Sequence, residues 1–221
     1  MFTHIEMQEL PELECETLPT GRTYITPEGN KYPSITTVLG NLSKEGILAW
    51  RKRVGEETAN KISTQAATRG TAVHQLAEDY VNNKEDWAKG AMPSNLFSFN
   101  QLKAVLDEKL DNVWAQEVPL YSDKFKIAGR VDCIAEWEGE LCIIDYKTAR
   151  KPKKAEWIEN YFMQAAFYAA AFYERTGVAI KKFAIVISVD DHEPQVFTGK
   201  TFEWLPKLLD ARIKYAEDKG I

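Results

Sequence analysis

The sequence contains little cysteine and no long apolar run. Its three cysteines, Cys15, Cys133 and Cys142, form no CxxC pair, which excludes a disulfide scaffold, a zinc ribbon and a four-cysteine iron–sulfur site. No window approaches the roughly eighteen apolar residues of a membrane span, and the start MFTHIEMQEL lacks the basic and apolar regions of a secretion signal. A P-loop of the form GxxxxGK[ST] is also absent, so no helicase motor is predicted. We therefore expect a cytoplasmic protein with no membrane contact.

An excess of negative charge is confined to the first residues. Lys and Arg total 28 and Asp and Glu total 33, but residues 1–20 hold five glutamates and no Lys or Arg, so the rest of the chain is balanced. Any contacts to nucleic-acid phosphates must therefore come from local patches. The densest such patch is KTARKPKK at residues 147–154, with five positive side chains and no negative one.

Hydrophobic periodicity predicts one α+β domain over residues 1–221. Residues 1–20 have the pattern of an acidic, extended lead-in, and RTYITPEGNKYPS that of a hairpin with its turn at PEGN. Residues 34–110 have helical spacing, with Ser34 as a cap and breaks near Gly55 and Gly70. Residues 113–221 are expected to form the catalytic core. It would have strands at 113–121, 126–137 and 140–148, a helix at 154–175, strands at 181–190 and 194–199, and a last helix at 201–218.

The register of one predicted hairpin places two acids together. If Glu138-Gly139 forms a two-residue turn, Trp137 pairs with Glu140 and Asp132 faces Asp145 on the neighbouring strand. Like charges that face each other across a sheet destabilise the pair. A divalent cation would neutralise them, and carboxylate oxygens suit Mg²⁺ or Mn²⁺.

The same register adds two basic residues to that face. Arg130 and Lys147 lie opposite each other, two residues from the aspartates. The other face of the hairpin is apolar and is expected to pack on a helix; its residues are Val131, Cys133, Ala135, Trp137, Cys142 and Ile144. A lysine beside a metal-bound carboxylate pair can orient or deprotonate a water and stabilise charge on a phosphate. A solvated surface ion pair is the alternative interpretation, and a three-residue loop would shift the register by one.

Four ordered motifs give the chain a resemblance to a nuclease family. Gly129-Arg130-Val131-Asp132, followed after twelve residues by Asp145-Tyr146-Lys147, resembles the core of the PD-(D/E)XK (restriction-endonuclease-like) superfamily, in its RecB-type branch. RGTAVHQLAED at 69–79 resembles that branch's histidine motif, and Gln164 with Tyr168 its QxxxY motif. The stretches GRTYITPEGNKYPSITTVLG and LAWRKRVGEETA are similar to exonucleases of mitochondrial genome maintenance and their phage and bacterial relatives.

The resemblance implies a fold and a set of site residues. The fold would be a mixed central sheet flanked by helices, with the N-terminal helical portion arching over the site. The implied ligands of Mg²⁺ or Mn²⁺ are His74, Asp132, Asp145 and the main-chain carbonyl of Tyr146. Lys147 would be catalytic together with the two aspartates, and Gln164 and Tyr168 would support Lys147 or the substrate. Glu117 would be an auxiliary acid. Glu78, one turn beyond His74, either fixes the imidazole or is a solvated helix residue.

The implied activity is metal-dependent hydrolysis of DNA from single-stranded ends. Phosphate contacts are expected at Arg69, Arg130, Lys151, Lys153 and Lys154, and base stacking at Trp50 or Tyr146. A phage-encoded protein would act in the host cytoplasm, with a replication or recombination protein as a possible partner. Two alternatives stay open at this point: an endonuclease on the same core, and a DNA-binding or interaction module without catalysis.

Overall fold

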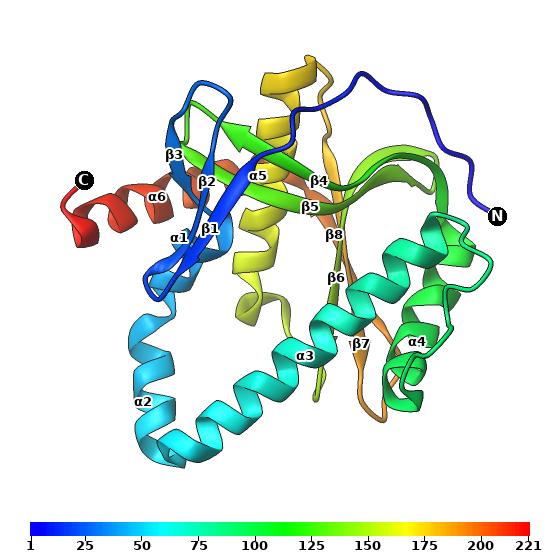
Figure 1. The fold of residues 1–221 in the computed structure, drawn as a ribbon, viewed down its shortest axis with the longest axis horizontal. Coiled ribbons are helices and arrows are strands. Elements are labelled where there is room, and N and C mark those ends of the chain that lie inside the picture. The colour runs from blue at the N-terminus through cyan, green and yellow to red at the C-terminus, as the bar shows by residue number, and fades with distance from the viewer.

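The computed structural model describes residues 1–221, which form two sheets and six α-helices (Figure 1). The strands are β1 Glu14–Leu18, β2 Gly21–Ile25, β3 Lys31–Pro33, β4 Leu110–Ser122, β5 Ile127–Trp137, β6 Glu140–Ala149, β7 Lys182–Val189 and β8 Gln195–Lys200. The α-helices are α1 Ile35–Leu42, α2 Lys44–Val54, α3 Glu56–Val81, α4 Pro93–Lys109, α5 Glu159–Thr176 and α6 Leu205–Lys219. Two short 3₁₀ helices are η1 Ala155–Trp157 and η2 Thr201–Trp204. None of the helices has both the length and the apolar character that a bilayer span needs.

The central sheet is mixed, as the α+β prediction requires. Its strand order is β4-β5-β6-β7-β8. Only β6 and β7 run parallel, and α5 forms the crossover between them. All other neighbours are antiparallel, because each is joined by a short connection. Both long middle strands, β5 and β6, are buried over most of their length.

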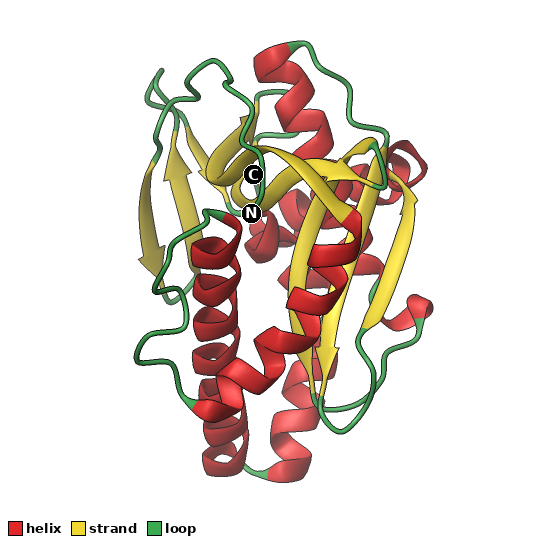
Figure 2. Ribbon diagram, turned by 90° about the vertical axis from the view of Figure 1, so that its right-hand side faces the viewer, coloured by secondary structure: helices red, strands yellow, loops and turns green.

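Helices cover both faces of this sheet, as Figure 2 shows for the molecule turned by 90°. One apolar layer joins α1, α5 and α6 to the sheet. The other layer joins α3 and α4 to the opposite face and contains Cys133, Trp137 and Cys142. The predicted packing of that face on helices is therefore confirmed. Val131 is an exception, since it belongs to the α5 side.

The N-terminal part begins as a small sheet and continues as helices. Strands β1, β2 and β3 pair antiparallel, so the predicted hairpin around PEGN is confirmed and part of the acidic lead-in adds a third strand to it. Ser34 caps α1 by accepting the amide N–H of Thr37, as predicted. Helix α2 buries no residue, and residues 56–68 of α3 bury only Ala59. This part of the chain therefore extends away from the sheet (Figure 1).

One of the two predicted helix breaks is absent. Gly55 does separate α2 from α3, with φ at +86°, a conformation that glycine adopts readily. Gly70, however, lies inside the continuous helix α3, so the prediction of a break there is wrong. A Cβ atom at Gly70 would meet nothing within 4 Å, and a single glycine costs a long, anchored helix only about 1 kcal/mol relative to alanine.

The β5–β6 hairpin has the predicted turn but a shorter ladder. Trp137 pairs with Glu140, and Glu138 and Gly139 both have positive φ, as a two-residue type I′ turn requires. The paired positions end at Cys133 and Ile144. The predicted direct opposition of Asp132 to Asp145, and of Arg130 to Lys147, is therefore wrong. The physical reason is that the Tyr146 amide donates to the Asp132 carboxylate, 2.9 Å away, instead of to a backbone carbonyl of β5.

The turn gives a prediction about stability with a matched control. Gly139→Ala forces a side chain into φ of +79° and should lower the free energy of unfolding by about 1 kcal/mol. Gly46→Ala, in the exposed helix α2 with nothing within 4 Å of a new Cβ, should instead raise it by up to about 1 kcal/mol. Urea denaturation followed by circular dichroism measures both. Equal effects of the two substitutions would contradict the assigned turn.

Candidate active site

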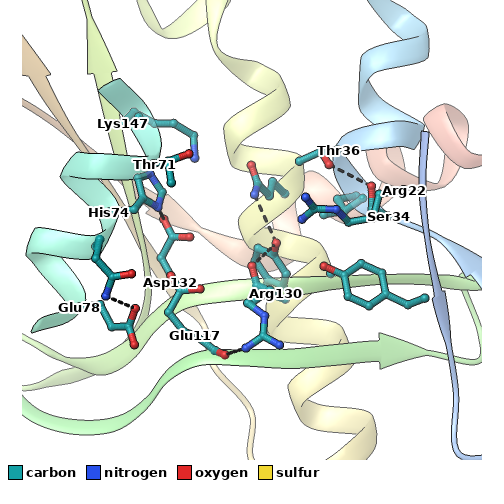
Figure 3. A pocket seen from close by; sticks show the side chains of 17 residues that line it. Arg22, Ser34, Thr36, Thr71, His74, Glu78, Glu117, Arg130, Asp132 and Lys147 are labelled. Carbon is teal, nitrogen blue, oxygen red and sulfur yellow. Dashed lines mark hydrogen bonds and ion pairs between the residues drawn. The ribbon is translucent and has the colours of Figure 1, made fainter. Parts of the chain in front are cut away.

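A cleft of about 490 Å³ collects most of the residues singled out in the sequence. One end is formed by α3, by the middle of β4 and of β5, and by the last residues of β6, with His74, Glu117, Asp132 and Lys147. The other end is formed by β2 and the start of α1. Figure 3 shows Arg22, Ser34 and Thr36 there, on the side away from His74. Gln164 and Tyr168 of α5 also line the cleft.

Three side chains from three different elements form a compact ligand set. His74 projects from α3, Glu117 from β4 and Asp132 from β5, and one ligand atom of each lies within 4.8 Å of the others. Val73, Leu76 and Ala77 are buried against the sheet, which fixes the face of α3 that carries His74. Glu117 has φ of +49°, uncommon for a residue with a side chain, and such conformations concentrate at functional sites.

Asp145 lies outside that set, although the sequence places it among the ligands. Its side chain is 1% exposed and does not line the cleft. The Lys147 ammonium lies 2.5 Å from Asp145 Oδ2 and is itself at the cleft wall. The contact is ionic and poorly aligned for a hydrogen bond, so both carboxylate oxygens of Asp145 are buried without a hydrogen-bond donor.

The donor set fits a hard divalent cation. Carboxylate oxygens, an imidazole nitrogen and a main-chain carbonyl are suitable ligands for Mg²⁺ or Mn²⁺. His74 Nε2 lies 2.7 Å from the Tyr146 carbonyl oxygen, which brings the fourth implied ligand to the same place. The residues present therefore fit the implied metal.

The electrostatics of the cluster follow from burial and from neighbouring charge. Burial, reinforced by the Asp132 carboxylate, raises the pKa of Glu117 to about 7. Burial also raises the pKa of Asp145, although Lys147 opposes this effect. Burial alone would raise the pKa of Asp132, but His74 and the Tyr146 amide hold it below its usual value. The cluster thus holds protons at neutral pH that a cation would displace.

His74 itself has acceptors on both sides of its ring. Nε2 faces the Tyr146 carbonyl, and Nδ1 lies 3.4 Å from Asp132 Oδ2. Burial alone would lower the pKa of His74, but the Asp132 carboxylate outweighs burial and raises it. A cation can bind either ring nitrogen only when that nitrogen carries no proton, so metal binding competes with a proton shared with the Tyr146 carbonyl or the Asp132 carboxylate.

The glutamine and tyrosine of α5 support a strand and do not contact Lys147. Gln164 Nε2 donates to the Tyr168 hydroxyl at 3.3 Å, and that hydroxyl donates to the main-chain carbonyl of Arg130 at 2.7 Å. Gly129 leaves the space for this contact, because a Cβ there would lie 3.0 Å from the Tyr168 ring. The pair therefore fixes β5 next to Asp132.

The predicted phosphate-contacting residues divide into two groups. Arg69 forms a two-armed ion pair with Asp190 and donates to Ser98, so its charge is already used within the protein. Arg130 donates to the Glu117 carbonyl and lies 3.2 Å from the Glu12 carboxylate. In the basic run, Lys147 pairs with Asp145, whereas Lys151, Lys153 and Lys154 form no ion pair. Lys151 and Lys154 are exposed, and Lys153 is half-buried.

Three further residues named in the sequence analysis lie as follows. The Tyr146 side chain is 2% exposed inside the α3–α4 layer, so it cannot stack on a base. Glu78 lines the cleft but accepts from Gln75 at 3.2 Å and makes no hydrogen bond to His74. Trp50 lies on α2, outside the cleft lining.

Sequence reasoning also missed part of the cleft wall. Thr71 belongs to the motif RGTAVH and could have been found from it. Arg22 and Thr36 carried no signal beyond the hairpin and the helix cap, because only the tertiary fold brings them to the site.

A comparison of the sequence with models of protein families shows to which family the chain belongs. The family model described as PD-(D/E)XK nuclease superfamily matches residues 46–205, which include every member of the ligand set. The chain belongs to the PD-(D/E)XK nuclease superfamily. The mixed sheet with helices on both faces agrees with this superfamily assignment.

Named relatives lie within the same superfamily branch that the motifs indicate. The human mitochondrial genome maintenance exonuclease 1 is 26% identical over 180 residues, 75% of this chain and 51% of the relative. The mouse protein of the same name is 26% identical over 132 residues, 56% of this chain and 39% of the relative. An ATP-dependent helicase/nuclease protein of Clostridium beijerinckii is 32% identical over 78 residues, 34% of this chain and 6% of the relative. The chain spans about half the length of the human exonuclease.

The raised pKa of Glu117 predicts a pH-dependent effect on stability. Its pKa is about 7 in the folded protein and about 4.3 in an unfolded chain, so raising the pH between these values favours unfolding. Glu117→Gln removes that contribution. Relative to wild type, the variant should therefore become progressively more stable as the pH rises from about 4.5 to about 7.5.

Urea denaturation in EDTA at several pH values measures this difference. Glu203→Gln, at an exposed position on η2, is the control and should keep the wild-type pH dependence. A difference between Glu117→Gln and wild type that is constant across the range would contradict the assigned protonation of Glu117.

Proposed function

We propose that the chain is a Mg²⁺- or Mn²⁺-dependent deoxyribonuclease that hydrolyses phosphodiester bonds from the ends of single-stranded DNA. The observation that carries the proposal is the meeting of His74, Glu117 and Asp132 in one cleft with Lys147 at its wall. Membership of a nuclease superfamily and relatives named as exonucleases support it.

The metal ligands follow from the donor set. His74, Glu117 and Asp132 would hold the cation, with the Tyr146 carbonyl and the buried Asp145 carboxylate beside them. When bound, the cation supplies positive charge at the scissile phosphate and lowers the pKa of a nearby water. Adding Glu117 to the ligands is a change from the sequence-based set, in which it is an auxiliary acid.

Lys147 would act on the phosphate and the water from the cleft wall. Asp145 holds its ammonium group from behind, which limits the flexible side chain to one direction. A charged ammonium so placed orients a water and stabilises negative charge that develops on the phosphate. Gln164 and Tyr168 contribute by holding β5, and with it Asp132, in register.

The DNA backbone would approach along the basic run that follows β6. Lys151, Lys153 and Lys154 form no ion pair within the protein, although Lys154 lies over the Trp157 ring, and they follow the strand that supplies Lys147 directly. Such contacts position the backbone without reading sequence. The proposal also includes DNA as the substrate in the cell and a cytoplasmic location. It further includes a replication or recombination protein as a partner.

Single substitutions separate catalysis from binding. Asp145→Asn and Lys147→Ala should each lower the rate of cleavage at least about 100-fold while leaving DNA binding within a few-fold of wild type. The control Lys151→Ala should do the opposite: it should weaken binding and reduce its salt dependence, with little change in kcat. Gel-based cleavage and fluorescence anisotropy measure the two quantities. Wild-type cleavage by both active-site variants would overturn the mechanism.

A panel of DNA substrates tests the mode of cleavage. End-labelled linear single strands should be degraded with Mg²⁺ or Mn²⁺ and not with EDTA, because the ligand set requires a cation. Circular single strands should remain intact, and linear duplexes should be cut more slowly. Cleavage of the circle would identify an endonuclease, and binding without cleavage under every condition would identify a DNA-binding module.

A further inference from the structure

The aromatic ring of Tyr161 lies close to Lys147. The Lys147 ammonium is 5.1 Å from the centroid of this ring, on the first turn of α5. Tyr161 is partly buried and does not line the cleft, whereas Lys147 does. Neither the motif at Gln164 and Tyr168 nor the metal ligand set includes this residue.

Tyr161 lies on the same face of α5 as Gln164 and Tyr168, the two residues that support β5. Residues 161, 164 and 168 follow steps of three and four, which place them on one side of a helix. Gln164 and Tyr168 use that side to hold the Arg130 carbonyl. The helix is anchored by a row of buried residues from Phe162 to Phe172, so the Tyr161 ring is carried by a rigid element.

An aromatic face attracts an ammonium group within about 6 Å of its centroid, and more strongly when the pair is removed from water. A lysine side chain has four rotatable bonds and loses much rotamer freedom when fixed. By itself, the contact with Asp145 restrains the Lys147 ammonium from one side only. The Tyr161 ring provides a second fixed contact to an ammonium group that lies at the cleft wall.

We propose that Tyr161 is a positioning residue that holds the Lys147 ammonium in its catalytic orientation through its aromatic face. This inference rests on the proposed function, because it assigns Lys147 the role described above. The ring, and not its hydroxyl, is the required group. The hydroxyl of Tyr161 makes no hydrogen bond in the structure, in contrast to that of Tyr168.

The test compares Tyr161→Phe with Tyr161→Leu. The phenylalanine variant keeps the aromatic face and should keep kcat within about twofold of wild type. The leucine variant keeps apolar volume but loses the face. Its kcat should fall about 3- to 30-fold with KM for DNA unchanged, which corresponds to the loss of about 0.7–2 kcal/mol. Circular dichroism and thermal melting check that both variants fold.

A second readout does not depend on activity. Reductive ¹³C-methylation labels the lysines, and Lys147→Arg assigns the Lys147 signal by its disappearance. A ring-current shift of that signal should be present in wild type and Tyr161→Phe and absent in Tyr161→Leu. If wild type cleaves no DNA, the proposed function fails, whereas the spectrum still tests the contact. Equal kcat values for the two variants, or a Lys147 signal unaffected by Tyr161→Leu, would overturn the inference.

Discussion

Two carboxylates buried where β5 and β6 separate are the constraint on which the site depends. Asp132 is 8% exposed and Asp145 is 1% exposed. Removing an ionised carboxylate from water costs several kcal/mol unless charge and hydrogen bonds replace its hydration. Asp132 obtains these from the Tyr146 amide and His74, and Asp145 obtains positive charge from Lys147. Asp132 therefore fixes the position of His74, and Asp145 fixes that of Lys147.

The fold satisfies this constraint by bringing a helix to each face of one strand pair. Helix α3 packs its apolar face on one side and delivers His74, while α5 packs on the other side and delivers Gln164 and Tyr168. Because both helices are anchored by buried side chains, the geometry of the site is held by the core of the protein. The site is therefore built on rigid elements, which catalytic groups require.

The sequence predicted the elements well and the site only partly. Alternation in β5 and β6 and the Glu138-Gly139 turn were enough to find the hairpin and its register, because both are local properties. The end of the ladder could not be predicted, since it depends on a side chain, Asp132, replacing a backbone acceptor. Motifs identified His74 and Lys147, but the pairing of Arg69 with Asp190 joins segments 121 residues apart and leaves no local signal.

The basic side chains in and near the cleft differ in whether a carboxylate of the protein already neutralises them. Arg69 and Arg130 lie at or near the cleft, yet each is held by a carboxylate of the protein itself, Asp190 or Glu12. A phosphate that contacts either arginine must displace an existing ion pair. The lysines of residues 151–154 have no such competitor, and their attraction for phosphate is reduced only by solvent and salt. In a chain whose residues 21–221 carry no net charge, three lysines without an ion pair form a local positive patch of the kind that attracts phosphate.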